Sequence, residues 1–121
     1  MKNMASLEMS GPFDFTREKI DLLVEPGKPG NYALGRYDEA TRKIIVKFVG
    51  RADEDLNSAL KGQLRLIQYK AFKYSFADDS KAAYEKECRN WHDFGGKVKL
   101  DCKFHPKAPE GSDWKCPRCG G

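Results

Sequence analysis

The sequence of 121 residues contains no apolar run that approaches the ~20 residues a membrane-spanning helix needs. Its first residues, MKNMASLEMSGPF, also lack the apolar core of a secretory signal peptide. These two absences lead us to expect a cytoplasmic protein with no membrane partner. In a reducing cytosol, the four cysteines are then expected to be thiols or metal ligands rather than disulfides.

Internal repeats and low-complexity tracts are absent as well, and neither charge sign is in large excess. The 22 lysines and arginines against 18 aspartates and glutamates give a net charge of +4. This mild excess favours polyanionic partners but does not by itself indicate a nucleic-acid-binding protein. The length suits one domain with a single hydrophobic core.

Residues 27–96 carry the patterns of a small α+β domain. Residues 43–49 give the strongest strand signal because they are rich in β-branched and aromatic side chains, and they form a predicted hairpin with the strand that starts at Tyr32. Residues 70–76 alternate aromatic and polar side chains, which predicts a third strand. With a helix after the hairpin and another after the third strand, we expect a three-stranded antiparallel or mixed sheet flanked by helices.

Both predicted helices have recognisable starts. The first begins near Asp53, a good N-cap, and its apolar stripe consists of Leu56, Leu60, Leu64 and Ile67. The second is capped by Asp78, Asp79 or Ser80 and runs to about His92.

Residues 1–26 are expected to form an N-terminal arm. Residues 1–12 are small and polar without periodicity, which predicts a loose segment, and one or two helical turns are predicted over residues 15–23. The prolines and glycines of residues 25–30 then end any helix, because proline lacks an amide donor and glycine frees the backbone.

Residues 97–121 form a polar tail that has little to bury but holds several metal-ligand side chains. It contains Cys102-x2-His105 and then Cys116-Pro117-Arg118-Cys119-Gly120. Zinc binds four such nitrogen and sulfur ligands tetrahedrally, and it would supply the folding energy that a polar tail cannot gain from burial. The spacing predicts a structural zinc site made by Cys102, His105, Cys116 and Cys119. The alternatives are a redox Cys-x-x-Cys, for which the typical βαβ context is absent, and unligated thiols on a flexible tail.

Two further residues compete for the metal. Cys88 becomes the alternative fourth ligand if the tail folds back against its helix, and is otherwise interpreted as a buried thiol beside Tyr84 and Trp91. His92 lies four residues after Cys88 on the same helix face, but near a helix C-terminus we interpret it as a surface residue that interacts with the helix dipole.

Several short motifs occur in an order that resembles the GIY-YIG nuclease superfamily over residues 27–95. They are Gly30-Asn31-Tyr32, Phe48-Val49-Gly50-Arg51, a helix that opens at Asp55-Leu56, and Glu87 in the later helix. The resemblance implies metal-dependent cleavage of phosphodiesters, with nucleic acid as partner and DNA favoured over RNA. It implies that Tyr32 acts as or assists the general base, that Arg51 stabilises developing charge, and that Glu87 holds Mg²⁺ or Mn²⁺.

Two positions depart from the family pattern. Phe48 stands where the family has its second tyrosine, and Ala59 stands at the position of the family's helix arginine. Loss of a preorganised cation lowers a rate by about 10²- to 10³-fold, so activity is expected to suffer. The alternative function is a catalytically degenerate, zinc-containing module that binds nucleic acid or protein. The tail's Lys97, Lys99, Lys103, Lys107, Lys115 and Arg118, together with Trp114, suit contacts to phosphates and bases.

Overall fold

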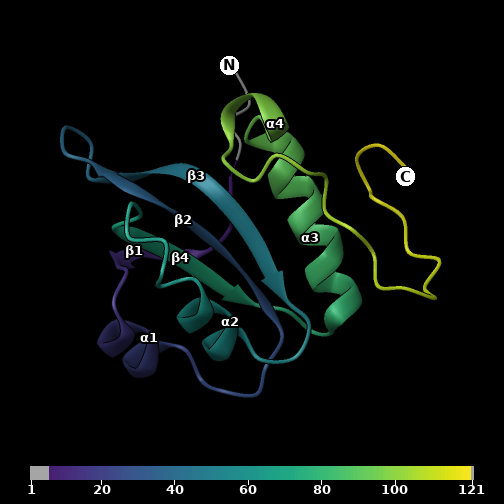
Figure 1. Ribbon diagram of the computed structural model, residues 1–121, viewed down its shortest axis with the longest axis horizontal. Coiled ribbons are helices and arrows are strands. Elements are labelled where there is room, and N and C mark those ends of the chain that lie inside the picture. The colour runs from purple at the N-terminus through teal and green to yellow at the C-terminus, as the bar shows by residue number, and fades with distance from the viewer. Residues whose placement is uncertain (1–5, 121) are drawn as a thin grey trace.

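The computed structural model describes residues 6–120 and has an α+β architecture (Figure 1). Its elements, in chain order, are β1 (Ser10–Asp14), α1 (Arg17–Leu23), β2 (Gly30–Asp38), β3 (Lys43–Ala52), α2 (Leu56–Gly62), β4 (Ala71–Phe76), α3 (Ser80–Asp93) and α4 (Gly96–Lys99). The strands form one antiparallel sheet in the order β1-β4-β2-β3. The predicted α+β class is confirmed, but the prediction of three strands was wrong because β1 adds a fourth strand beside β4.

β1 was missed because its sequence carries little strand signal. Gly11 and Pro12 occupy two of its five positions, and the register with β4 shifts between Ser10 and Phe13. Phe13 secures the pairing, since its ring lies 5.8 Å from that of Phe72 and 6.1 Å from that of Tyr74. The prediction of a loose segment over residues 1–12 was therefore wrong for residues 10–12 and for Leu7, which is buried in the core. Residues 1–5 lie outside the described part of the chain. The helical turns predicted over residues 15–23 are confirmed as α1.

The hairpin predicted around residues 43–49 is confirmed as β2 and β3, with β3 at one edge of the sheet. In its register Tyr32 lies opposite Gly50, and Asn31 lies opposite Arg51. A Cβ atom at position 50 would lie only 2.4 Å from Cζ of Tyr32. The glycine therefore lets the Tyr32 ring lie directly across β3.

The two faces of the sheet are covered by different helices. On one face, α1 and α2 pack around a cluster that contains Ile20, Val24, Tyr32, Leu34, Leu56, Leu60 and Phe72. On the other face, a second cluster contains Leu7, Ala33, Val49 and Leu100, with Trp91 and Phe94 of the α3 region packed against it. Because alternate strand residues point to opposite faces, Tyr32 and its neighbours Asn31 and Ala33 are directed to different sides of the sheet.

The two predicted helices are confirmed, with one change of length. The side chain of Asp55, rather than Asp53, caps α2 by accepting a hydrogen bond from the Ser58 amide at 3.2 Å. α2 ends at Gly62, where glycine weakens a helix by about 1 kcal/mol, so the stripe prediction was wrong at Ile67, which is 76% exposed. Asp79 caps α3 in the same way through the Ala82 amide.

The tail that follows α4 has no regular strand or helix up to residue 120. It runs beside α3, which lies between the yellow tail and the sheet in Figure 1. Cys116 of the tail is buried against Tyr84 and Cys88 of α3, and Trp114 and Ala108 pack on this small cluster. Among the described residues, no helix is long and apolar enough to cross a membrane.

Candidate functional site

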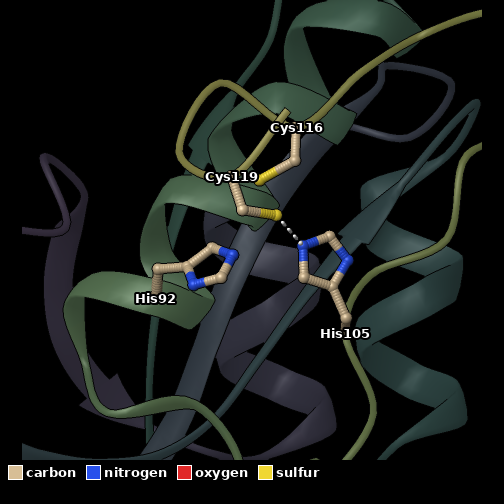
Figure 2. A group of neighbouring side chains, drawn as sticks. All are labelled: His92, His105, Cys116 and Cys119. Carbon is tan, nitrogen blue, oxygen red and sulfur yellow. Dashed lines mark hydrogen bonds between the residues drawn. The ribbon is translucent and has the colours of Figure 1, made fainter. Parts of the chain in front are cut away.

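Four side chains from α3 and the tail form a group that could hold a metal ion. His92 comes from the last turn of α3, and the tail supplies His105, Cys116 and Cys119 (Figure 2). One nitrogen or sulfur atom from each residue lies within 4.8 Å of the corresponding atoms of the other three. Two histidines and two cysteines are a donor set that a transition metal such as zinc accepts.

The two imidazole rings are prepared for this role in different ways. Nδ1 of His105 lies 2.7 Å from the Pro106 carbonyl oxygen, and because a carbonyl only accepts, Nδ1 carries the proton. This leaves the lone pair of His105 Nε2 facing Sγ of Cys119 at 3.4 Å. Nε2 of His92 is buried without any hydrogen-bonding partner among the described residues. A buried, unpaired ring nitrogen is costly unless something binds it, and a metal ion is such a partner.

The Cys116-Pro117-Arg118-Cys119 turn favours a thiolate. The amide of Arg118 donates to Sγ of Cys116 at 3.4 Å, and the amide of Gly120 donates to the Cys116 carbonyl at 2.8 Å. Burial opposes ionisation of Cys116, but hydrogen bonds from the backbone of Cys119 and Arg118 outweigh it and lower the pKa of the thiol to about 6. A metal-binding cysteine must be deprotonated, so this turn is suited to supply a ligand.

Three of the four ligands predicted from the sequence meet in this group, but Cys102 is not one of them. Sγ of Cys102 accepts a hydrogen bond from the Val49 amide at 3.4 Å, and its carbonyl accepts one from Trp91 Nε1 at 2.8 Å. These contacts hold Cys102 against β3, and His92 takes the fourth place in the group. His92, which we interpreted from the sequence as a surface residue, is instead half-buried, and its ring is directed at the two thiols.

Cys88, the alternative fourth ligand, is also outside the group. It is fully buried against Tyr84, as its interpretation as a buried thiol expected, but its other buried neighbour is Cys116 and not Trp91, which packs in the second cluster. Burial raises the pKa of Cys88 to about 12, which keeps it a neutral thiol. The sequence did hold a signal for His92, because its position four residues after Cys88 places both on the face of α3 that receives the tail.

Arg51 and Glu87, both expected from the family resemblance, form an ion pair on the α3 face of the sheet. Nη1 of Arg51 lies 2.7 Å from Oε1 of Glu87, and Nε lies 2.9 Å from Oδ1 of Asp53. Nη2 donates to the carbonyl of Lys107 in the tail at 2.8 Å, and the guanidinium lies 5.2 Å from the centre of the Tyr84 ring. The pair is thus covered by α3 and by the tail, and its side chains are only 13% and 15% exposed.

Burial raises the pKa of the Glu87 carboxyl, while the hydrogen bond and charge of Arg51 act in the opposite direction. The net direction is upward, so the fold favours the protonated form relative to an exposed glutamate. At neutral pH the adjacent guanidinium compensates much of the free-energy cost of burying the Glu87 carboxylate.

Tyr32 and Ala59 lie on the opposite face of the sheet from this pair. The Tyr32 hydroxyl accepts a hydrogen bond from Nε2 of Gln63 at 3.0 Å, and its ring stacks on Phe48 with the ring centres 6.5 Å apart. Ala59 packs against the same apolar cluster. Burial, with the charge of Glu87 as a smaller contribution, raises the pKa of Tyr32 to about 12. The candidate residues therefore approach the Gly50–Arg51 segment of the edge strand from both of its faces.

Replacing Arg51 by methionine should lower the free energy of unfolding by about 3 kcal/mol at neutral pH, because the buried Glu87 carboxylate loses its cation. The folded state then binds the Glu87 proton more tightly than the unfolded state does. The decrease in the free energy of unfolding should therefore be small at a pH below ~4.3, the ordinary pKa of glutamate. It should grow as the pH rises through the raised pKa of Glu87 in the folded state. Urea unfolding at a series of pH values measures it.

The double variant Arg51→Met, Glu87→Met is the control for this prediction. It removes both charges together and should recover most of the lost stability. An equal loss for the single variant at every pH would contradict the assignment of the effect to Glu87.

Comparison of the chain with models of known protein families, with curated proteins and with solved structures found no match.

Proposed function

We propose that the chain is a nucleic-acid-processing domain of GIY-YIG type, with a phosphodiester-cleaving site around Arg51 and Glu87 and a tail fixed by structural zinc. The observation that supports it most is the 2.7 Å contact between Arg51 and Glu87, which are 36 residues apart in the sequence. The family resemblance assigns a role to each of them independently of this contact. The hairpin, the following helix, the next strand and α3 also occur in the order that the resemblance implies.

Zinc is the metal that best suits His92, His105, Cys116 and Cys119. Two imidazoles and two thiolates complete its usual four-coordinate shell, and a shell filled by protein ligands is typical of structural rather than catalytic zinc. The role also fits the tail, which has no regular secondary structure and only a small apolar cluster to hold it on α3. Metal binding would supply the remaining folding energy.

Glu87 meets the requirements for the divalent cation that the resemblance implies. Its Oε1 binds Arg51, whereas its Oε2 has no hydrogen bond to the described residues and is not fully enclosed. One carboxylate can hold Mg²⁺ because this ion keeps most of its water ligands. When bound there, the cation would supply Lewis-acid charge to a phosphodiester.

The chain's own residues would contribute charge and orientation. Arg51 places a guanidinium beside Glu87, where it can stabilise negative charge that develops on a phosphate. Tyr32, with a pKa of about 12, is protonated at neutral pH, so in this arrangement its hydroxyl serves as a hydrogen-bonding group rather than as a free base. Ala59 supplies no cation on the Tyr32 face, and we therefore expect slow cleavage.

Cleavage of labelled DNA in the presence of Mg²⁺ or Mn²⁺ tests the proposal. We expect slow cleavage of single-stranded, duplex or branched DNA that Glu87→Gln abolishes. Glu85→Gln, on the same helix, is the matched control and should cleave like the unchanged chain. Equal cleavage by the Glu87→Gln and Glu85→Gln variants would contradict the proposed site.

A second function, binding without cleavage, is favoured by the hydrogen bonds of Arg51. Its guanidinium already contacts Asp53, Glu87 and the Lys107 carbonyl, so a phosphate would have to displace one of these partners. Salt-sensitive DNA binding without cleavage, both by the unchanged chain and by the Ala59→Arg variant, would indicate this function instead.

A further inference from the structure

An exposed basic surface lies where α4 and the start of the tail meet β3. We call it the basic ridge, and it consists of Lys47, Lys97, Val98, Lys99, Lys103 and Phe104. Its lysines are brought together by contacts to α4. Nζ of Lys47 donates to the Lys99 carbonyl at 3.4 Å, and Nζ of Lys103 donates to the Lys97 carbonyl at 3.1 Å.

Most of the positive charge of the ridge is not compensated locally. None of its lysines forms a salt bridge within the described residues. Asp93 pairs with Arg118 at 2.8 Å, whereas Asp101, which accepts from the Tyr69 hydroxyl at 2.6 Å, keeps its charge and offsets one of the four lysines. An array of unpaired ammonium groups attracts a polyanion.

Phe104 is the most exposed large apolar side chain in the described part of the chain, at 89%, and Val98 follows at 81%. The backbone on both sides of Phe104 is fixed. Cys102 is bonded to Val49 and Trp91, and His105 belongs to the metal-ligand group. The ring is thus exposed to solvent between two residues that contact the rest of the fold, which suits it to stack on a planar partner.

The sequence also suggested Trp114 and Arg118 for contacts to bases and phosphates, but both make other contacts in the structure. The Trp114 ring lies 6.0 Å from that of Tyr84, and Arg118 makes two hydrogen bonds to the Asp93 carboxylate. Phe104 is therefore the aromatic side chain of the tail that remains available.

The ridge leads to the Arg51–Glu87 pair. The tail runs along the edge strand from Val49, which it meets through Cys102, to Arg51, which it meets through the Lys107 carbonyl. Lys47, Val49 and Arg51 are alternate residues of β3 and share one face of the sheet. A strand bound along the ridge would end near the tail segment at Lys107 that covers the pair.

We propose that the basic ridge binds single-stranded DNA, with the lysines on phosphates and a base stacked on Phe104. A single strand fits better than a duplex because its bases have free faces on which an aromatic ring can stack. The inference rests on the proposed function in taking nucleic acid as the ligand. Binding is measured without added divalent cations, so its outcome does not depend on cleavage.

Fluorescence anisotropy with a fluorescein-labelled thymidine oligomer of about 15 nucleotides tests the ridge. Phe104→Ala should weaken binding about 5- to 150-fold, as expected for loss of one stacked base. Ile67→Ala, which removes another exposed apolar side chain at 76% exposure, should leave binding unchanged.

The lysines are tested together by the triple variant Lys97→Ala, Lys99→Ala, Lys103→Ala. It should reduce the slope of log affinity against log salt by about 2, since each phosphate contact on a single strand contributes about 0.7. The control Arg17→Ala, Lys70→Ala, Lys81→Ala removes the same charge from exposed positions elsewhere and should keep the slope.

The outcomes separate the ridge from the cleavage site. Binding that the ridge variants reduce would support the ridge whether or not the chain cleaves DNA. Binding that neither ridge variant alters, tighter binding to duplex than to the single strand, or no binding at low salt would each overturn it. The cleavage site is judged separately by the Glu87→Gln comparison.

Discussion

Replacing Cys116 by serine should abolish stoichiometric zinc binding and release the tail from α3. Cys116 belongs to the group of four side chains that could hold a metal ion, and it is also buried against Tyr84 and Cys88. Structural zinc contributes on the order of 10 kcal/mol to the folding of small zinc-binding peptides, far more than the small apolar cluster of this tail can supply. The apparent melting temperature should fall, and trypsin should cut quickly at Lys107 and Lys115, which are exposed in the tail.

The ligand set is tested by comparing two further variants. His92→Ala should lose zinc as Cys116→Ser does, because the structure places His92 in the metal group. Cys102→Ser is the matched cysteine control and should retain one equivalent of zinc, since Cys102 bonds to Val49 instead. Metal analysis after purification without chelators measures the stoichiometry. The reverse result, with zinc lost in Cys102→Ser and kept in His92→Ala, would show that the ligand set predicted from the sequence is the correct one.

Local patterns were enough to predict the central elements of the fold. The hairpin, α3 and β4 each have a periodic apolar pattern or a capping residue within their own sequence. β1 could not be predicted in this way, because it is a strand only through its pairing with β4 and the packing of Phe13 on that strand. α4 was missed for a similar reason, since its four residues are placed by the turn at Gly95 and by Leu100, which is buried.

In the candidate site too, features set by neighbouring residues could be predicted, and features set by the packing of distant segments could not. The Cys116-x2-Cys119 turn is visible in the sequence because its geometry is local. The choice between Cys102 and His92 depends on how the tail folds back on α3, which spacing alone does not determine. The family resemblance placed Tyr32, Arg51 and Glu87 in one site, and the structure brings Arg51 and Glu87 together. Tyr32 instead points to the opposite face of the sheet, with its ring across Gly50.

Under the proposed function, introducing arginine at position 59 should raise the rate of DNA cleavage by about 10²- to 10³-fold, the effect expected from one preorganised cation at a phosphoryl-transfer site. Ala59 lies on α2, in the apolar cluster that contains Tyr32, and it is only partly buried. A long side chain at this position can therefore pass the cluster and carry its charge towards the Tyr32 hydroxyl and Gln63. The measurement is kcat/KM on the DNA that gives the highest rate in the cleavage assay of the proposed function.

Ala59→Met is the control that separates charge from bulk, because methionine fills similar space without a cation. Both variants should melt within a few degrees of the unchanged chain, since position 59 is not fully enclosed. Combining Ala59→Arg with Glu87→Gln should return the rate to the background level, because the proposed cleavage depends on the Glu87 carboxylate and a cation on the other face of the edge strand cannot replace it. If Ala59→Met accelerates cleavage as much as Ala59→Arg, or if Ala59→Arg stays active without Glu87, the cation at position 59 does not complete a site with Arg51 and Glu87.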